Sequence, residues 1–124
     1  YQVSGVIVKG KALGRTIDYP TANLKPDETY KLIPKEGVYV TQATIDSTTY
    51  FGITSIGTNP TVGGTQETIE TFFLDYKGDL YDQKLTLTFL THIRDEAVFD
   101  TIDSLKKAIA GDERFARDFL KNRE

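Results

Sequence analysis

Residues 37–56 read GVYVTQATIDSTTYFGITSI and contain the clearest strand pattern in the chain. Within residues 37–45 the side chains alternate between two faces, with Val38 and Val40 on one face and Tyr39 on the other. The turn formers Asp46 and Ser47 come next, and residues 49–56 form a second strand segment. The stretch therefore predicts an antiparallel hairpin.

Further strands are predicted on both sides of this hairpin, at residues 3–8, 67–76 and 84–93. Between the hairpin and the next strand, residues 57–64 contain glycines and a proline, and they predict a long loop. Five or more short strands followed by a helical region predict a small antiparallel barrel or sandwich, mainly β in class.

The last quarter of the chain has helical spacing, carried by Ile102, Leu105 and Ile109. Thr101 or Asp100 is expected to cap this helix at its start. Gly111 is placed to end the helix, and Asp112 is placed to begin a second helical segment.

Composition excludes several classes of protein. The chain has 124 residues, which is the size of one domain. It has no cysteine, which excludes thiol catalysis and cysteine-bound zinc and fits a cytoplasmic location. Its single histidine, His92, cannot build a multi-histidine metal site, and no apolar run reaches the ~18 residues of a membrane span. Lys+Arg number 15 and Asp+Glu 18, which argues against general nucleic-acid binding.

Residues 10–23 read GKALGRTIDYPTAN, which combines glycines, basic residues, a proline and short polar residues and is unlike a segment of a hydrophobic core. Glycines let backbone amides approach an anion closely, and basic side chains add positive charge. Pro20 restricts the backbone that leads into Thr21 and Asn23, whose oxygens point the same way if the segment is extended. This stretch predicts a loop that binds phosphate and magnesium.

Glu70 is an acidic residue in an apolar strand. Phe72 shares its face, and Ile69, Thr71 and Phe73 form the other, so Glu70 is expected to be partly desolvated. Desolvation raises the pKa of a carboxyl group, which suits a general base. The alternative is a structural glutamate that pairs with an arginine near a strand end.

Residues 14–24 resemble the G-R-T-x-G-[FY]-P-T-A-N-[LI] signature of the riboflavin kinase family. The resemblance covers nearly the whole chain in the same order, through residues 37–39, 55–61, 69–71, 78–81 and 93–99. Two positions depart from the family pattern: Asp18 stands where glycine is common, and Phe72 stands where histidine is common.

This resemblance implies a six-stranded antiparallel Greek-key barrel with a C-terminal helix. It implies a kinase that transfers the γ-phosphate of ATP to the 5′-hydroxyl of riboflavin, with Glu70 as the base and Thr21 and Asn23 holding Mg²⁺. The residues implied in nucleotide binding are Gly10, Lys11, Gly14, Arg15, Thr21, Asn23, Phe73, Asp75 and Tyr81. Those implied in flavin binding are Arg94, Asp95 and Phe99.

The resemblance also implies that residues 1–124 are one kinase domain, expected to be part of a longer bifunctional chain with an N-terminal FMN adenylyltransferase domain. With one histidine, this chain itself lacks that domain's H-x-G-H-type motif, so it is expected to make FMN and no FAD. No nucleic-acid or membrane partner is expected. The rival hypothesis is a non-catalytic β-barrel module that binds flavin or nucleic acid.

Overall fold

The predicted hairpin is present in the computed structural model as strands β3 (Gly37–Ile45) and β4 (Thr48–Thr61), with Ile45 opposite Thr48. Its turn residues Asp46 and Ser47 have positive φ angles of 50° and 69°, as a type I′ turn requires. The structure describes residues 2–8, 22–26, 35–76, 80–97 and 100–123.

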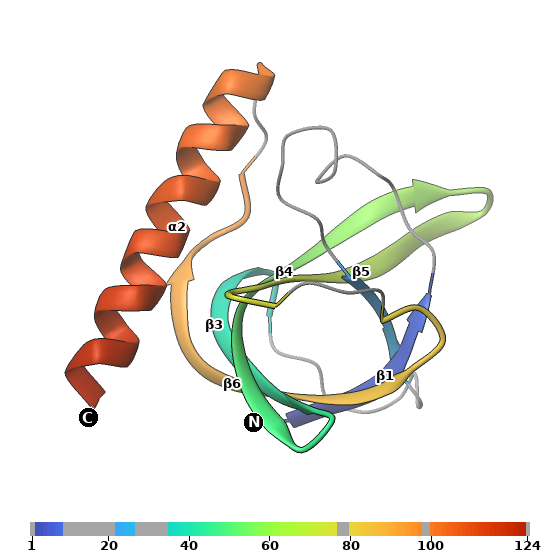
Figure 1. Cartoon of the computed structure of the whole chain (residues 1–124). Helices are drawn as coiled ribbons and strands as arrows, with labels where there is room; N and C mark the ends of the chain where they lie inside the picture. The colour runs from blue at the N-terminus through green and yellow to red at the C-terminus, as the bar shows by residue number, and fades with distance from the viewer. Residues whose placement is uncertain (1, 9–21, 27–34, 77–79, 98–99, 124) are drawn as a thin grey trace.

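Six strands close into an antiparallel barrel in the order β1-β2-β5-β4-β3-β6 (Figure 1). The remaining strands are β1 (Gln2–Val8), β2 (Ala22–Pro26), β5 (Gly64–Phe73) and β6 (Lys84–Arg94). Because β3, β4 and β5 follow one another and β6 returns beside β3, the connection is a Greek key. The expected six-stranded Greek-key barrel is confirmed.

The barrel interior is filled by one face of every strand. Its buried apolar residues are Val3, Ile7, Leu24, Tyr39, Ala43, Ile45, Ile56, Ile69, Phe73, Leu80, Leu85 and Leu87. A buried hydroxyl chain also crosses the interior, because Thr54 Oγ1 lies 2.9 Å from Thr41 Oγ1 and 2.7 Å from Thr71 Oγ1. These hydrogen bonds satisfy the hydroxyl groups, whose burial would otherwise be costly.

A second cluster covers part of the outer barrel surface beneath the helix α2 (Ile102–Arg123), which lies along one side of the barrel in Figure 1. We call it the outer cluster. Its buried members are Val38, Val40, Ile53, Leu74 and Ala116, and Phe72, Leu90, Ile93, Phe119 and Leu120 pack against it. Among the described segments, no helix combines the length and apolar character that a membrane span requires.

The predicted break in the C-terminal helix is wrong. One helix runs from Ile102 to Arg123 through Gly111. Thr101 caps its start as expected, because Thr101 Oγ1 accepts a hydrogen bond from the Ser104 amide at 3.1 Å. Asp112 is buried at 5% exposure rather than placed at a helix start. Packing of the second half against the barrel outweighs the weak helix propensity of one glycine.

The predicted loop at residues 57–64 is also wrong. β4 and β5 stay paired as far as Thr61 opposite Gly64, and they form a hairpin that extends beyond the barrel (Figure 1). In the described residues, β3 pairs with β4 only as far as Ile56, so the end of β4 has β5 as its partner. A strand with one free edge tolerates a proline such as Pro60.

Candidate active site

A row of cross-strand partners lies on the outer face of the barrel between β2 and β4. Asn23 on β2 lies opposite Glu70 on β5, and Glu70 lies opposite Ser55 on β4. Directly opposed residues in antiparallel strands have Cβ atoms about 4.5–5.5 Å apart and project to the same face. We call Asn23, Glu70 and Ser55 the polar row. It brings an amide, a carboxylate and a hydroxyl together from three strands.

Glu70 projects outward because its neighbours on β5 project inward. Ile69 and Thr71 are each 2% exposed and are buried in the barrel. The next outward residue, Phe72, packs against the outer cluster, so the position that departs from the family pattern has an apolar packing role. Glu70 itself is half-buried, as expected from the apolar residues on both faces of its strand. A carboxylate in this setting is suited to accept a proton from a bound hydroxyl.

Asn23 projects outward from the short strand β2. Its neighbour Leu24 is buried in the barrel core, and Ala22 packs against the same core, so Asn23 is left on the outer face. The side chain of Asn23 is half-buried. Several residues predicted for the site lie outside the described residues: Gly10, Lys11, Gly14, Arg15, Thr21 and Phe99.

Glu96 reaches the polar row from the segment that follows β6. Ser55 Oγ donates a hydrogen bond to Glu96 Oε1. The other carboxylate oxygen, Oε2, lies over Gly57, where an added Cβ would come within 3.0 Å of it. The glycine thus leaves the space that the glutamate side chain occupies on the outer face of β4.

Arg94, at the end of β6, is tied to α2. Its Nε and Nη2 donate hydrogen bonds of 2.9 and 2.8 Å to the two carboxylate oxygens of Asp112. The hydrogen bond to Asp112 raises the pKa of the Arg94 guanidinium, although burial acts in the opposite direction. Arg94 also belongs to the same cross-strand series as the polar row, because Val38 lies opposite both Ser55 and Arg94. The two hydrogen bonds to Asp112 hold the Arg94 guanidinium in one orientation.

Asp95 is highly exposed, with 80% of its side chain accessible. Its Oδ1 lies 3.4 Å from His92 Nε2 and 4.0 Å from Lys35 Nζ. The ring of His92 contacts Tyr39 edge-on, with centroids 5.1 Å apart. The Asp95 carboxylate therefore lies at the protein surface, next to the side chains of His92 and Lys35.

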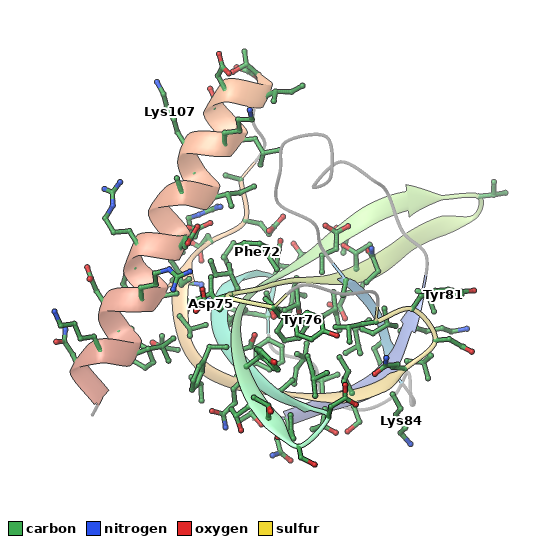
Figure 2. All side chains as sticks on the ribbon, viewed as in Figure 1. Phe72, Asp75, Tyr76, Tyr81, Lys84 and Lys107 are labelled. Carbon is green, nitrogen blue, oxygen red and sulfur yellow. The ribbon has the colours of Figure 1, made fainter. Side chains whose placement is uncertain are left out.

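The structure does not bring the other three predicted nucleotide contacts into the polar row. Phe73 is 6% exposed and packs inside the barrel. Asp75 pairs with Arg117 of α2 at 3.1 and 3.2 Å, and this pairing lowers the pKa of its carboxyl group. Tyr81 is 51% exposed. Figure 2 shows Asp75 beside the helix and Tyr81 on the opposite side of the barrel.

Sequence reasoning missed Ser55 and Asp112 as members of this region, and it did not connect Glu96 with Ser55. One signal was available for Asp112, which interrupts an apolar series at helical spacing between Ile109 and Ala116. A carboxylate on the packed face of a helix needs a basic partner, because an unpaired buried charge is costly. No comparable signal in the sequence links Glu96 to Ser55.

The donor set near the polar row can be compared with what a metal ion requires. Among the residues that the structure describes, no three His, Cys, Asp or Glu side chains are grouped as a metal site. The Asn23 amide beside Glu70 offers a neutral oxygen to an ion that also binds ligand phosphates. Mg²⁺ takes oxygen ligands and keeps several waters, so these donors fit a magnesium–nucleotide complex.

Comparison with known proteins gives one consistent family. The model of the riboflavin kinase family, Flavokinase, matches residues 1–120. The chain is 40% identical over 111 residues to an RNA-binding riboflavin kinase of Bacillus subtilis, covering 89% of this chain and 47% of that protein. It is 38% identical over 121 residues to the bifunctional riboflavin kinase/FMN adenylyltransferase of Escherichia coli, covering 97% of this chain and 38% of that protein. The chain thus spans less than half the length of these relatives.

Solved structures share the fold. A chain described as a macrolide-efflux protein from Streptococcus pneumoniae superposes with a TM-score of 0.88 at 35% identity, covering 94% of this chain and 38% of that one. Riboflavin kinase from Trypanosoma brucei superposes with a TM-score of 0.63 at 24% identity, covering 97% of this chain and 79% of that one. At that identity, the second likeness concerns the fold alone.

Proposed function

We propose, from the premise that this chain belongs to the riboflavin kinase family, that it transfers the γ-phosphoryl group of ATP to the 5′-hydroxyl of riboflavin. The observation that carries this proposal is the polar row, in which Asn23 and Glu70 are direct cross-strand partners. The products are FMN and ADP. In this reaction the hydroxyl oxygen forms a bond to phosphorus, the bond from phosphorus to the ADP oxygen breaks, and the hydroxyl proton leaves.

Glu70 is the proposed acceptor of that proton. Phosphoryl transfer depends mainly on alignment and on neutralising charge, so the protein needs only one base within hydrogen-bond reach of the attacking hydroxyl. Glu70 is half-buried and lies in the middle of the polar row, which supports this role.

Asn23 is the proposed contact to Mg²⁺ and the nucleotide phosphates, together with Thr21. The bound ion would neutralise phosphate charge that develops during transfer. Gly10, Lys11, Gly14 and Arg15 are proposed to bind the nucleotide phosphates, and Phe73, Asp75 and Tyr81 stay proposals for the base or ribose. Because Phe73 is in the core and Asp75 is paired with Arg117, a contact from either requires a rearrangement on binding.

Arg94, Asp95 and Phe99 are proposed to bind the flavin. Support comes from the position of Arg94 at the end of β6, in the cross-strand series that also contains Ser55 and Glu70. The ATP phosphates at Asn23 and the flavin at Arg94 would then lie on opposite sides of Glu70. This arrangement places the base between donor and acceptor.

We further propose that residues 1–124 are the kinase part of a longer bifunctional protein with an N-terminal FMN adenylyltransferase domain. The small share of the bifunctional relatives that the chain covers supports this. A cytoplasmic location is consistent with the absence of cysteine. We propose no nucleic-acid partner for this domain because its net charge is −3. RNA binding is named for the Bacillus subtilis relative, of which the chain covers 47%.

The test is a direct assay of the product. The purified chain is incubated with riboflavin, ATP and Mg²⁺, and FMN is resolved from riboflavin by chromatography. The proposal expects FMN and ADP in equal amounts, with none when Mg²⁺ is removed by chelation. A flavin-binding module without catalysis would bind riboflavin and form no FMN, and that result would overturn the proposal.

A further inference from the structure

Residues 94–97, which begin at the last residue of β6, are held from two sides. On one side, Asp112 of α2 binds both Nε and Nη2 of Arg94. On the other side, Ser55 of β4 binds Glu96. The segment is thus attached to the helix at its first residue and to the barrel two residues later, so its path over the outer face is set by two side-chain contacts.

The contact with Asp112 orients the Arg94 side chain more than it stabilises the fold. Asp112 is 5% exposed in a helix face that otherwise packs on apolar residues, and both of its oxygens are used by one guanidinium. A buried ion pair contributes little net stability compared with well-packed apolar residues. What the bidentate geometry does provide is a fixed guanidinium plane. Arg94 Nη1 also donates to the Asp95 carbonyl at 3.3 Å, which ties the guanidinium to the segment itself.

The contact with Ser55 sets the distance between the segment and the polar row. Ser55 lies directly opposite Glu70, so the residue that binds Glu96 is the immediate strand neighbour of the proposed base. Gly57 contributes by leaving room for the Glu96 carboxylate, since an added Cβ would approach Oε2 to 3.0 Å. A contact this close is tighter than the carboxylate accepts without moving.

We propose that Asp112 and Ser55 are positioning residues for the acceptor substrate. This inference rests on the proposed function. Through Arg94 and Glu96, the two residues hold segment 94–97 in the position that presents the hydroxyl of bound riboflavin to Glu70. The C-terminal helix thereby contributes to the acceptor site through the contact of Asp112 with Arg94, without contacting the substrate itself.

The experiment compares three variants in kinetics and in binding. Asp112→Asn removes the charge that orients Arg94, and Ser55→Ala removes the hydrogen bond to Glu96. Glu113→Gln is the matched control, because it removes a carboxylate from the next helical position, where its partner is Arg117 at 3.0 Å. Riboflavin affinity is measured from the change in flavin fluorescence, and KM is determined separately for riboflavin and ATP.

Asp112→Asn is expected to weaken riboflavin binding and raise its KM about tenfold, the effect of one charged hydrogen bond. Ser55→Ala is expected to raise the same KM about threefold to tenfold. In both variants KM for ATP stays within about twofold of wild type, and Glu113→Gln changes neither value. Ser55→Thr, which keeps the hydroxyl, is expected to restore the wild-type KM for riboflavin. Because Ser55 is half-buried at a strand surface, its variants remain informative if Asp112→Asn folds poorly.

Two results overturn the inference while leaving the proposed function intact. One is an active wild-type enzyme whose Asp112→Asn and Ser55→Ala variants bind riboflavin as wild type does. The other is a uniform fall in kcat with a lower Tm and unchanged KM for both substrates, which is the behaviour of a purely structural contact. A wild-type chain that makes no FMN would instead overturn the proposed function. The wild-type assay shows this result before any variant is compared.

Discussion

Asn23 and Glu70 lie directly opposite each other on the neighbouring strands β2 and β5, and both side chains project from the outer face of the barrel. Two residues that are distant in sequence thereby share one small region of surface. Antiparallel pairing alone produces this proximity, since opposed residues have Cβ atoms about 4.5–5.5 Å apart. The position of the amide beside the carboxylate is the basis for the proposed site.

Replacing Asn23 by alanine is expected to weaken binding of magnesium–nucleotide about tenfold, because one oxygen donor to a charged ligand is lost. Calorimetric titration with Mg-ADP measures the change. Lys25→Ala is the control, since Lys25 projects from the same face of β2 and is exposed. Wild-type affinity in Asn23→Ala would count against the assignment of this residue to the metal and phosphates.

Replacing Thr54 by valine tests the buried hydroxyl chain. Thr54 is 0% exposed and its Oγ1 is within hydrogen-bond distance of both Thr41 and Thr71. Valine keeps the shape but leaves both neighbouring hydroxyls without this partner. The free energy of unfolding in urea is expected to fall by about 1–3 kcal/mol. No change in the urea midpoint would show that the hydroxyl chain contributes nothing to stability.

Replacing Gly111 by alanine tests the continuity of α2. Gly111 lies inside the helix, and an added Cβ has no heavy atom within 4 Å. Alanine is therefore expected to stabilise the protein by about 0.5–1 kcal/mol, because it has the higher helix propensity. Thermal unfolding measures the effect. If the helix ended here with a left-handed glycine, alanine would destabilise the protein instead.

Asp75→Asn tests the pH dependence of stability at a second ion pair that involves α2, between Asp75 and Arg117. The hydrogen bond from Arg117 lowers the pKa of Asp75 in the folded protein, whereas the unfolded value is about 3.9. A depressed folded pKa gives stability that is present above the unfolded pKa and is lost as the pH falls through the folded pKa. The side chain is 74% exposed, so the contribution is expected to be below about 1 kcal/mol.

The measurement for Asp75 is urea unfolding of wild type and Asp75→Asn at pH 7 and near pH 3. The wild type is expected to be the more stable at pH 7, with the difference shrinking at the lower pH. Asparagine also accepts the left-handed backbone of this position, where φ is 61°. The substitution therefore adds no backbone strain to the measured difference in stability. A difference that is equal at both pH values would contradict the pairing as its cause.

Short-range patterns predicted the elements whose structure depends on local sequence. Alternation in residues 37–45 and the Asp46-Ser47 turn predicted the β3–β4 hairpin, and the apolar neighbours of Glu70 predicted its half-buried position. The closed barrel came from the resemblance to a family, since alternation alone is compatible with a sandwich.

Elements that depend on distant parts of the chain were not predicted. The helix continues through Gly111 because its second half packs on the barrel, and propensity does not include that packing. The contacts of Asp112 with Arg94 and of Ser55 with Glu96 join segments that meet only in the closed barrel. No short sequence motif marks either of these two contacts.

The turnover of Glu70→Gln tests whether Glu70 is the base of the phosphoryl transfer. Initial rates of FMN formation are compared for wild type, Glu70→Gln and the control Glu67→Gln, an exposed glutamate on the same strand. Glu70→Gln is expected to lose about 10²-fold or more in kcat while its nucleotide affinity is retained, and Glu67→Gln is expected to keep wild-type rates. Wild-type turnover in Glu70→Gln would show that this residue is not the base.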